Sequence, residues 1–342
     1  MRDGNILILR GHEVGALLQG RELELIEVIR RAYEIHDAKH SALPHSVFLR
    51  FPYDPSARII ALPAYIGGDF ATAGIKWVSS FPGNLEKGMD RASAVIILNS
   101  TDTGRPEAII EGSIISAKRT AASAALAARS LHHGDASTVG LLGCGVINFE
   151  ILRFLKASFS EIETLVISDI GIERAELFKQ KCIRLDPKLN VIIEPDPLTM
   201  MRSCSLISLA TTSSEPHIFD LSGCIPGSTI LHISLRDLSP EVILANDNVV
   251  DDVDHVCRAM TSIHLTQQLT GHTEFVRGSL ASVFTGKAPE KRDATAHTIF
   301  SPFGLGVLDI AVGRLLMSLA QDEKQGTIIE SFLPASWTGT NV

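Results

Sequence analysis

Hydrophobic residues in the first third of the chain change from a helical to a strand-like spacing. Between Arg21 and His40 they recur at helical intervals among charged residues, at Leu25, Ile29, Ala32 and Ile35, which predicts one amphipathic helix. Short apolar runs bounded by Gly, Pro, Asp and Asn follow, and they predict strands over residues 47–51, 59–65, 73–79, 94–99 and 107–110. We expect an antiparallel sheet whose last hairpin turns at residues 102–106.

The rest of the chain alternates between predicted strands and predicted helices. An alanine-rich segment without Gly or Pro, residues 114–131, predicts a long connecting helix. Beyond it, apolar strands are predicted over residues 138–142, 165–168, 191–193, 206–210, 230–233 and 248–250, followed by a final helix over 307–319. Strands that alternate with helices predict a doubly wound parallel sheet, so the fold class is α/β.

The sharpest chemical signal is a glycine turn after the first strand of that sheet. Gly143 permits a tight turn, and Gly145 lets the backbone approach a pyrophosphate held at the N-terminus of the next helix. This pattern is typical of dinucleotide-binding proteins. Asn148 stands at the position of the third glycine, so the fingerprint is incomplete, and an ordinary glycine turn is the alternative interpretation.

Asp169 ends the next predicted strand, 21 residues beyond Asn148. An acidic side chain there can accept hydrogen bonds from both ribose hydroxyls of the adenosine half, and it repels a 2'-phosphate. Asp169 therefore favours NAD over NADP. The alternative is that Asp169 caps a helix over residues 172–185, and the two roles can coexist.

Polar side chains also follow two later strands. Thr211 and Thr212 come after the fourth strand of the parallel sheet, and Ser234 and Asp237 come after the fifth. Ligands bind beyond the carboxyl ends of parallel strands, so both segments are expected to face the cofactor. Asp237 could supply the acid or base that oxidation of an amine requires, or it could cap a helix that begins at Pro240.

Two cations of the first third are further candidates. Lys76 lies in an apolar strand, where a charge needs a partner that an anionic substrate would supply. Arg119 lies near the start of the connecting helix. The alternative for each is a solvated or structurally paired charge.

Composition narrows the classes of function. The chain has 342 residues, of which 45% are hydrophobic, and this length suits two domains. The net charge of -8, without blocks of like charge, argues against nucleic acid and anionic membranes as partners. Five widely spaced cysteines and scattered histidines predict a reducing compartment and no metal. No apolar stretch approaches the ~20 residues of a membrane span, so we expect a cytoplasmic protein.

Several local sequences, in this order, resemble the ornithine cyclodeaminase and mu-crystallin family over nearly the whole chain. They are Gly-x-Lys-Trp at 74–77, Arg-Thr-Ala-Ala at 119–122, the glycine turn at 143–145 and the acidic Asp169. The sequences at 61–68, 74–77, 91–99 and 301–304 are most similar to the branch that makes 2,3-diaminopropionate for siderophores and peptide antibiotics.

This resemblance implies a Rossmann domain for NAD, residues 126–307, and an α+β substrate-binding and dimerisation domain, residues 1–125 with 308–342. It also implies a homodimer that forms through the first domain. The implied reaction is NAD-dependent oxidation of N-(1-amino-1-carboxy-2-ethyl)-L-glutamate. Water then hydrolyses the imine to 2-oxoglutarate and L-2,3-diaminopropionate.

The resemblance also assigns roles to individual residues. Lys76 and Arg119 would bind substrate carboxylates, and Asp237, with Lys76, would form the catalytic pair, Asp237 as acid–base. The residues implied to bind the cofactor are Ser93, Arg119, Thr120, Gly143, Gly145, Val146, Ile147, Asp169, Thr211, Thr212, Ser234 and Pro302.

The chain departs from the family pattern in two further places. Many members have a basic residue two positions after a proline in the first strand, whereas here Pro44 is followed by His45 and Ser46. His45 or Arg50 is the candidate replacement for substrate binding. The family often has a lysine shortly after the position of Asp237, which is absent here, so the substrate could differ.

Three other functions fit the same resemblance. One is an ornithine cyclodeaminase-type lyase that uses NAD transiently and forms no net NADH. Another is a ketimine reductase or an alanine dehydrogenase on the same scaffold. The last is a nucleotide-dependent binding protein of the mu-crystallin kind, without catalysis.

Overall fold

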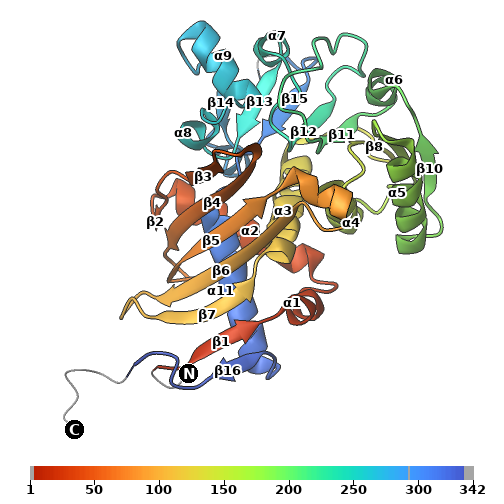
Figure 1. Cartoon of the computed structure of the whole chain (residues 1–342). Coiled ribbons are helices and arrows are strands. Elements are labelled where there is room, and N and C mark those ends of the chain that lie inside the picture. Colours follow the sequence, from red (N-terminus) through yellow and green to blue (C-terminus); the bar gives the residue numbers. More distant parts are fainter. Residues whose placement is uncertain (1–3, 292, 335–342) are drawn as a thin grey trace, which may run out of the picture. The chain divides into compact units, whose positions relative to one another are not determined.

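The computed structural model describes residues 4–291 and 293–334 (Figure 1). The chain divides into two compact units, Met1–Arg119 with Leu305–Val342, and Thr120–Gly304. The first boundary falls inside the connecting helix α3 (Ser113–Leu131), after Arg119 rather than after residue 125. The second falls after Gly304 rather than after residue 307.

The first unit is built on an eight-stranded sheet with the order β16-β1-β7-β6-β5-β4-β2, and β3 pairs with β4. The strands are β1 (Ile6–Leu9), β2 (Ser41–Ala42), β3 (Val47–Phe51), β4 (Asp54–Ile66), β5 (Thr72–Ser80), β6 (Ala92–Ser100), β7 (Pro106–Glu111) and β16 (Thr327–Ile329). The predicted antiparallel pairing of β3 to β7 is confirmed.

The sheet also has a parallel pair that was not expected, because β1 pairs with β7 in parallel. Neither β1 nor β16 was predicted. Strands of four and three residues are too short to show the alternation by which a strand is recognised in a sequence. Pairing with distant segments, and not local pattern, makes them strands.

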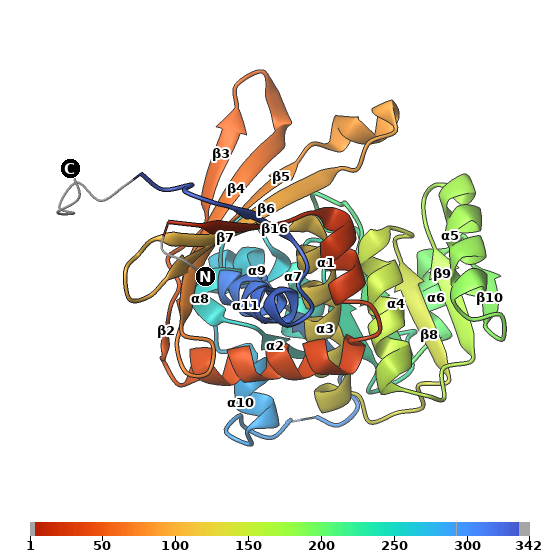
Figure 2. The same ribbon diagram turned by 90° about the horizontal axis from the view of Figure 1, so that it is seen from below.

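The returning helix α11 (Gly306–Asp322) packs against β4, β5 and β6, and α2 (Glu22–Asp37) packs against α11 (Figure 2). The predicted helices over 21–40 and 307–319 are thereby confirmed. A helix covered on both sides is apolar around most of its surface, as α11 is. The short elements α1 (Gly11–Leu17) and η1 (Pro82–Lys87) complete the unit.

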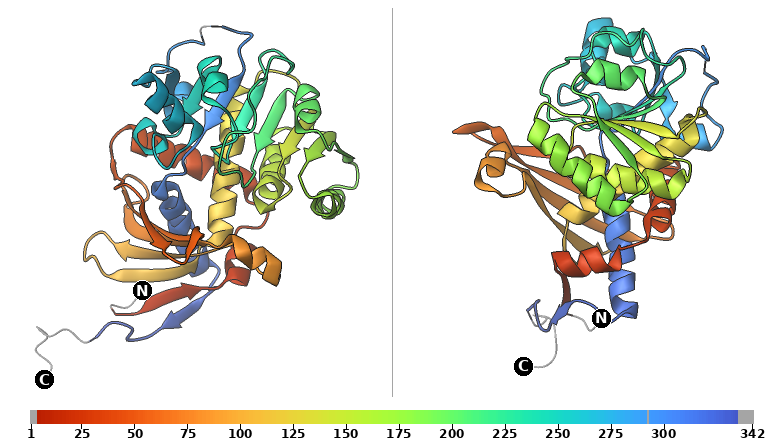
Figure 3. Two further views of the ribbon diagram at one scale, coloured as in Figure 1. Left: turned by 45° about the horizontal axis from the view of Figure 1, so that its top comes forward. Right: turned by 90° about the vertical axis from the view of Figure 1, so that its right-hand side faces the viewer.

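The second unit is an eight-stranded parallel sheet with the order β10-β9-β8-β11-β12-β15-β13-β14, and helices pack on it (Figure 3). The strands are β8 (Thr138–Leu142), β9 (Thr164–Ser168), β10 (Asn190–Ile193), β11 (Leu206–Leu209), β12 (Thr229–His232), β13 (Asp247–Val250), β14 (Val276–Ser279) and β15 (Thr298–Ser301). The helices are α4 (Val146–Ser158), α5 (Ile172–Leu185), α6 (Pro197–Arg202), α7 (Pro240–Leu244), α8 (Val253–Val256), α9 (Ser262–Thr270) and α10 (Leu280–Phe284). The predicted doubly wound sheet is confirmed, although β14 and β15 were not foreseen.

The strand order reverses direction between β8 and β11. From β8 the chain moves outward to β9 and β10, then returns to β11 on the other side of β8 and continues to β12. In open parallel sheets, ligands usually bind outside the carboxyl ends of the two strands at which the order reverses.

Among the helices of the described residues, none is both long and apolar enough to cross a membrane.

Candidate functional site

The glycine turn lies where β8 and β11 run side by side. Gly143 has a φ of +93°, and a Cβ added there would lie 2.5 Å from the carbonyl oxygen of Ala210. Gly145 is the N-cap of α4, and a Cβ there would meet open space among the described residues. Gly143 is therefore required by the fold, whereas Gly145 leaves room in front of the first backbone N–H groups of α4.

Asn148 fastens this turn instead of disturbing it. Its side chain is fully buried, and Nδ2 donates to the carbonyls of Leu142 (2.8 Å) and Gly143 (2.7 Å). Its Oδ1 accepts a hydrogen bond from Ser208 Oγ in β11 at 2.7 Å. An amide thus does by hydrogen bonding what the third glycine does elsewhere by close packing.

Asp169 follows β9 and holds the turn from the other side. Its Oδ2 accepts from the backbone N–H of Cys144 at 2.8 Å, and its Oδ1 accepts from that of Gly171 at 2.8 Å. Gly171, not Asp169, is the N-cap of α5. Arg174, in the first turn of α5, lies 3.3 Å from Oδ1. Each carboxylate oxygen has two lone pairs, so Oδ2 keeps one for a ribose hydroxyl.

Asp237 is fully buried beyond β12, and its carboxylate accepts hydrogen bonds from Thr211 Oγ1 and Ser234 Oγ. Burial alone raises the pKa of Asp237. The hydrogen bond and charge of His232, with the two hydroxyls, outweigh burial and lower that pKa to about 2. The capping interpretation of Asp237 is wrong, because Ser239 caps α7. Asp237 is therefore an ionised carboxylate with no structural task in α7.

Two histidines that the sequence did not single out as site residues flank Asp237. His232 Nε2 lies 3.2 Å from Asp237 Oδ2 and 3.1 Å from its backbone N, and His232 Nδ1 contacts Ser301 Oγ at 3.1 Å. His217 Nε2 lies 3.8 Å from Asp237 Oδ1. His232 lies five positions before Asp237, at the end of β12, and this position was the signal that could have identified it as a site residue. No local pattern links His217 to Asp237.

In the first unit, Lys76 and Arg119 share one carboxylate. Lys76 Nζ donates to Asp309 Oδ2 at 2.7 Å, and Arg119 Nε donates to Asp309 Oδ1 at 3.0 Å. All three side chains are buried. Burial, and then the charge of Arg119, lower the pKa of Lys76 to about 8, although Asp309 opposes both. This cluster of two cations and one anion carries one excess positive charge, which suits an incoming carboxylate.

Asp309 was not predicted. The final helix was, and an aspartate in its apolar run was the usable signal, because a buried charge needs partners. The expectation that Lys76 needs a partner is confirmed, and Asp309 supplies it in the protein itself. The paired-charge interpretation of Lys76 and Arg119 is thus correct, and the excess charge leaves the binding role open.

Three of the other residues predicted for the first unit do not join this cluster. Arg50 is exposed on β3, with its guanidinium 5.6 Å from the ring centre of Phe48. Ser93 Oγ contacts Ser79 Oγ at 2.8 Å on the sheet face opposite to Lys76. His45 is exposed between β2 and β3.

The remaining predicted residues lie in the second unit, most of them near the carboxyl ends of its strands. Val146 and Ile147 begin α4, and Val146 is exposed. Thr212 is exposed after β11, and Pro302 is buried after β15. Thr120 opens the second unit within α3.

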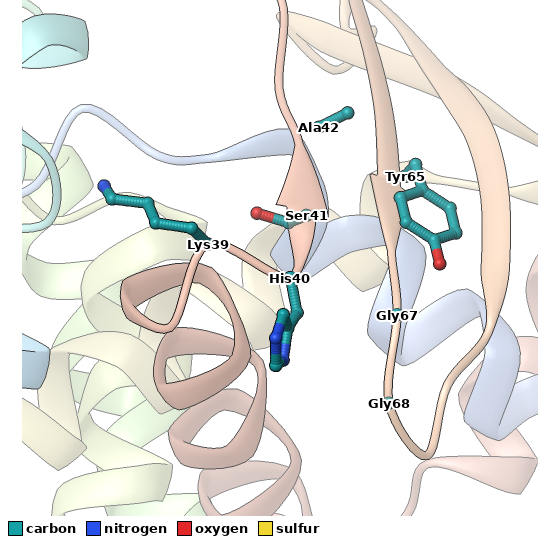
Figure 4. A pocket seen from close by; sticks show the side chains of 7 residues that line it. All are labelled: Lys39, His40, Ser41, Ala42, Tyr65, Gly67 and Gly68. Carbon is teal, nitrogen blue, oxygen red and sulfur yellow. The ribbon is translucent and has the colours of Figure 1, made fainter.

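A cavity of about 410 Å³ opens in the first unit, where β2 faces the end of β4 (Figure 4). It is lined by Lys39, His40, Ser41, Ala42, Tyr65, Gly67 and Gly68. In Figure 4 the side chain of Lys39 points away from the ring of Tyr65. The cavity contains none of the predicted site residues, so we do not assign it to the candidate site.

Residues 11–324 match the model of the ornithine cyclodeaminase/mu-crystallin family. The chain belongs to this family. The resemblance inferred from the local sequences is therefore confirmed. A curated member, N-((2S)-2-amino-2-carboxyethyl)-L-glutamate dehydrogenase of Staphylococcus aureus, is 29% identical over 90% of this chain and 93% of its own length. It belongs to the predicted branch.

Solved structures of this family have the same fold. An archaeal alanine dehydrogenase dimer with bound NAD has a TM-score of 0.85 and 26% identity, covering 95% of this chain and 99% of the other. The Δ(1)-pyrroline-2-carboxylate reductase of Thermococcus litoralis, in complex with NADH and L-proline, has a TM-score of 0.87 and 23% identity. That comparison covers 94% of this chain and 99% of the other.

Proposed function

We propose that the protein is an NAD-dependent amino-acid dehydrogenase that oxidises N-(1-amino-1-carboxy-2-ethyl)-L-glutamate to L-2,3-diaminopropionate and 2-oxoglutarate. The observation that carries the proposal is the ionised, buried carboxylate of Asp237. It accepts a hydrogen bond from Thr211, which follows β11 and lies next to Gly143 of the glycine turn. The substrate is inferred from the Staphylococcus aureus relative, which is a dehydrogenase of this compound. The product would be a precursor of siderophores or peptide antibiotics.

The second unit fits a dinucleotide. The space at Gly145 and the N–H groups of the first turn of α4, which point out of the helix, would hold the pyrophosphate. Asp169 would hold the adenosine ribose, which favours NAD over NADP. Thr211, Thr212, Ser234 and the start of α4 would line the rest of the cofactor. Bound NAD supplies the acceptor for the hydride that leaves the α-carbon of the glutamate half.

The cationic cluster would bind substrate carboxylates. Arg119 uses only Nε toward Asp309 within the described residues, so its terminal nitrogens can form paired hydrogen bonds to a carboxylate. Lys76 adds a point charge that is present while its ammonium stays protonated. An anion here would neutralise the excess charge of the cluster, and a dicarboxylate substrate provides one.

Asp237 would exchange the protons of the reaction. It is ionised at neutral pH, so it accepts a proton from the substrate ammonium and frees the nitrogen lone pair. That lone pair forms the C=N bond as the hydride leaves. Water then adds to the imine, and the carbinolamine breaks down to 2-oxoglutarate and the free amine of diaminopropionate.

The deciding experiment follows reduced-nicotinamide absorbance with purified protein, NAD and the proposed substrate, with mass analysis of the products. We expect net NADH, 2-oxoglutarate and diaminopropionate. Ammonia from ornithine or lysine without net NADH would instead indicate a cyclodeaminase. NADH formed only with alanine would indicate an alanine dehydrogenase, and NADH consumed with a cyclic imine a ketimine reductase.

Asp237→Asn separates an enzyme from a binding protein. Loss of the base should lower kcat by about 10²-fold or more while NAD affinity is kept. The matched control is Asp220→Asn, which changes an exposed aspartate of the same unit. Equal turnover of wild type and Asp237→Asn would contradict the assigned role.

We further propose that a second copy of the chain covers the sheet face opposite to α11, giving a homodimer. Val47, Ala61 and Trp77 lie side by side on that face, and Val47 and Trp77 are exposed. A groove of about 380 Å³, lined mainly by apolar residues of β4 and β5, lies on the same unit. The alanine dehydrogenase of the same fold is a dimer.

Light scattering tests this assembly. The wild type is expected at twice the mass of one chain, and the double substitution Val47→Glu with Trp77→Glu is expected to shift it toward the monomer, because two charges would be buried unpaired. Phe219→Glu, at an exposed position of the second unit, is the control. A monomeric wild type would refute the proposal.

A further inference from the structure

Asp237 must lose a proton to solvent in every catalytic cycle, although its side chain is fully buried. The overall oxidation and hydrolysis convert a substrate ammonium, NAD and water into the ketoacid, the product ammonium, NADH and one free proton. A carboxyl group that has taken up this proton has to release it before the next turnover. The hydroxyls of Thr211 and Ser234 that contact Asp237 donate hydrogen bonds to it and have no acid–base function of their own near neutral pH.

His217 stands between this carboxylate and solvent. Its Nε2 lies 3.8 Å from Asp237 Oδ1, and 39% of its side chain is exposed. This distance is a little beyond hydrogen-bond length, and catalytic hydrogen bonds are often long in the absence of ligands and tighten when these bind. Among the described residues, the other ionisable group recorded beside Asp237 is His232, whose ring is fully buried.

The backbone fixes His217 in this position. The N–H groups of His217 and Ile218 both donate to the carbonyl oxygen of Asp237 at 2.9 Å, and Ile218 forms an isolated parallel bridge with Leu238. Backbone hydrogen bonds at Asp237 thus join the segment that follows β11 to the segment that follows β12. These hydrogen bonds hold the backbone of His217 next to that of Asp237.

His232 is placed for a different task. Its Nε2 lies 3.1 Å from the backbone N and 3.2 Å from Oδ2 of Asp237, and its Nδ1 contacts Ser301 Oγ, so both ring nitrogens are engaged inside the unit. It orients the carboxylate, and its ring is fully buried. Of two charged residues close in the sequence to this site, Arg236 donates to the carbonyl of Ala259 and Glu215 is exposed.

We infer that His217 relays the proton from Asp237 to solvent. The hydride and its two electrons go to NAD, and the proton goes from the substrate ammonium to Asp237 Oδ1. His217 Nε2 then accepts this proton, and the resulting imidazolium releases a proton from Nδ1 to water, which returns a neutral ring and an ionised carboxylate. The relay rests on the proposed oxidation of an amine but not on which side chain the substrate carries.

The test compares steady-state kinetics of wild type and His217→Gln. At pH 7 we expect kcat to fall about tenfold or more, with the substrate KM and the Kd of NAD within about twofold of wild type. The difference in kcat between His217→Gln and wild type should become smaller as the buffer concentration rises, because small bases can accept the proton in place of His217. His133→Gln, which changes an exposed histidine of the same unit, should behave as wild type.

Rescue separates proton relay from a structural role. In His217→Ala, which leaves space beside Asp237, added imidazole should restore a large part of kcat in a saturable manner, and more so near neutral pH. An independent measurement needs no turnover: the ring proton resonance of His217 at fixed pH should move when Asp237 is replaced by Asn, because the two side chains are neighbours.

The outcomes are distinct. If the wild type is active and His217→Gln keeps full kcat at all buffer concentrations, or loses kcat that neither imidazole nor buffer restores, the relay is overturned. If the wild type forms NADH with none of the amino-acid substrates, the proposed function itself fails and the relay with it. Retained KM together with imidazole rescue supports the relay.

Discussion

Asp309, in the helix that returns to the first unit, lies 2.7 Å from the ammonium of Lys76, although 233 residues separate them in the sequence. The same carboxylate binds Arg119 at 3.0 Å. Helix α11 therefore does more than fill the core of the first unit. It supplies the counter-ion that lets two cations be buried together, and the cluster keeps one positive charge in excess.

Asp309→Asn should destabilise the first unit and weaken substrate binding. The amide leaves two buried cations without a counter-ion, so we expect the free energy of unfolding to fall by about 3–5 kcal/mol, measured by denaturant titration. The substrate KM should rise as Lys76 and Arg119 lose their fixed position. The control is Glu323→Gln at the C-cap of the same helix, which removes an exposed ion pair with Arg21 worth at most about 1 kcal/mol. Equal effects of the two substitutions would contradict this account.

The affinity for substrate should depend on the charge of Lys76. Its pKa is about 8, so the ammonium is protonated below that pH and becomes neutral above it. We therefore expect the substrate KM to rise about tenfold between pH 7 and pH 9. Lys76→Arg keeps its charge throughout this range and should remove that part of the pH dependence, whatever the substrate itself contributes. A wild-type KM that stays constant to pH 9 would rule out the role of Lys76.

Asp169 should set the preference for the cofactor. Asp169→Ala removes the acceptor for ribose hydroxyls and also the carboxylate that would repel a 2'-phosphate, so NAD affinity should fall more than NADP affinity. Some loss for both is expected, because the N–H groups of Cys144 and Gly171 lose their acceptor. Isothermal titration with each cofactor measures the ratio of the two Kd values. An unchanged ratio would count against the assignment.

The two glycines of the turn should differ in what they contribute. Gly143→Ala forces a side chain into a positive φ and 2.5 Å from a carbonyl oxygen, so it should lower stability by about 2 kcal/mol or more. Gly145→Ala meets open space and should leave stability near that of wild type, but its methyl group would weaken NAD binding. Thermal unfolding and cofactor titration on both variants provide the comparison. Intact NAD affinity in Gly145→Ala would mean that the pyrophosphate lies elsewhere.

Local pattern predicted most of the long elements correctly. The strands β3 to β7, the long α3 and the helix over residues 172–185 all follow from hydrophobic spacing and breaker residues, because these signals act within a few positions of each other. The short β1 and β16 were missed, since each becomes a strand only by pairing with a distant partner.

Asn148 shows why the glycine fingerprint could be recognised but not fully interpreted. In the sequence it appears as a missing glycine. In the structure its amide bonds the carbonyls of Leu142 and Gly143 and receives Ser208 from β11. Asn148 therefore departs from the motif and still stabilises the turn, because Ser208, 60 residues away in the sequence, completes its hydrogen bonds.

The sequence by itself determined the α/β class, the doubly wound order of elements, the glycine turn and the acidic group after β9, because each depends on residue spacing within one or two elements. Only the tertiary structure decided that Asp309 is the counter-ion of Lys76 and Arg119, that Ser239 and not Asp237 caps α7, and that His217 lies beside Asp237. A buried charge selects its partner by distance in space and by exclusion of water, and neither can be derived from the spacing of residues along the chain.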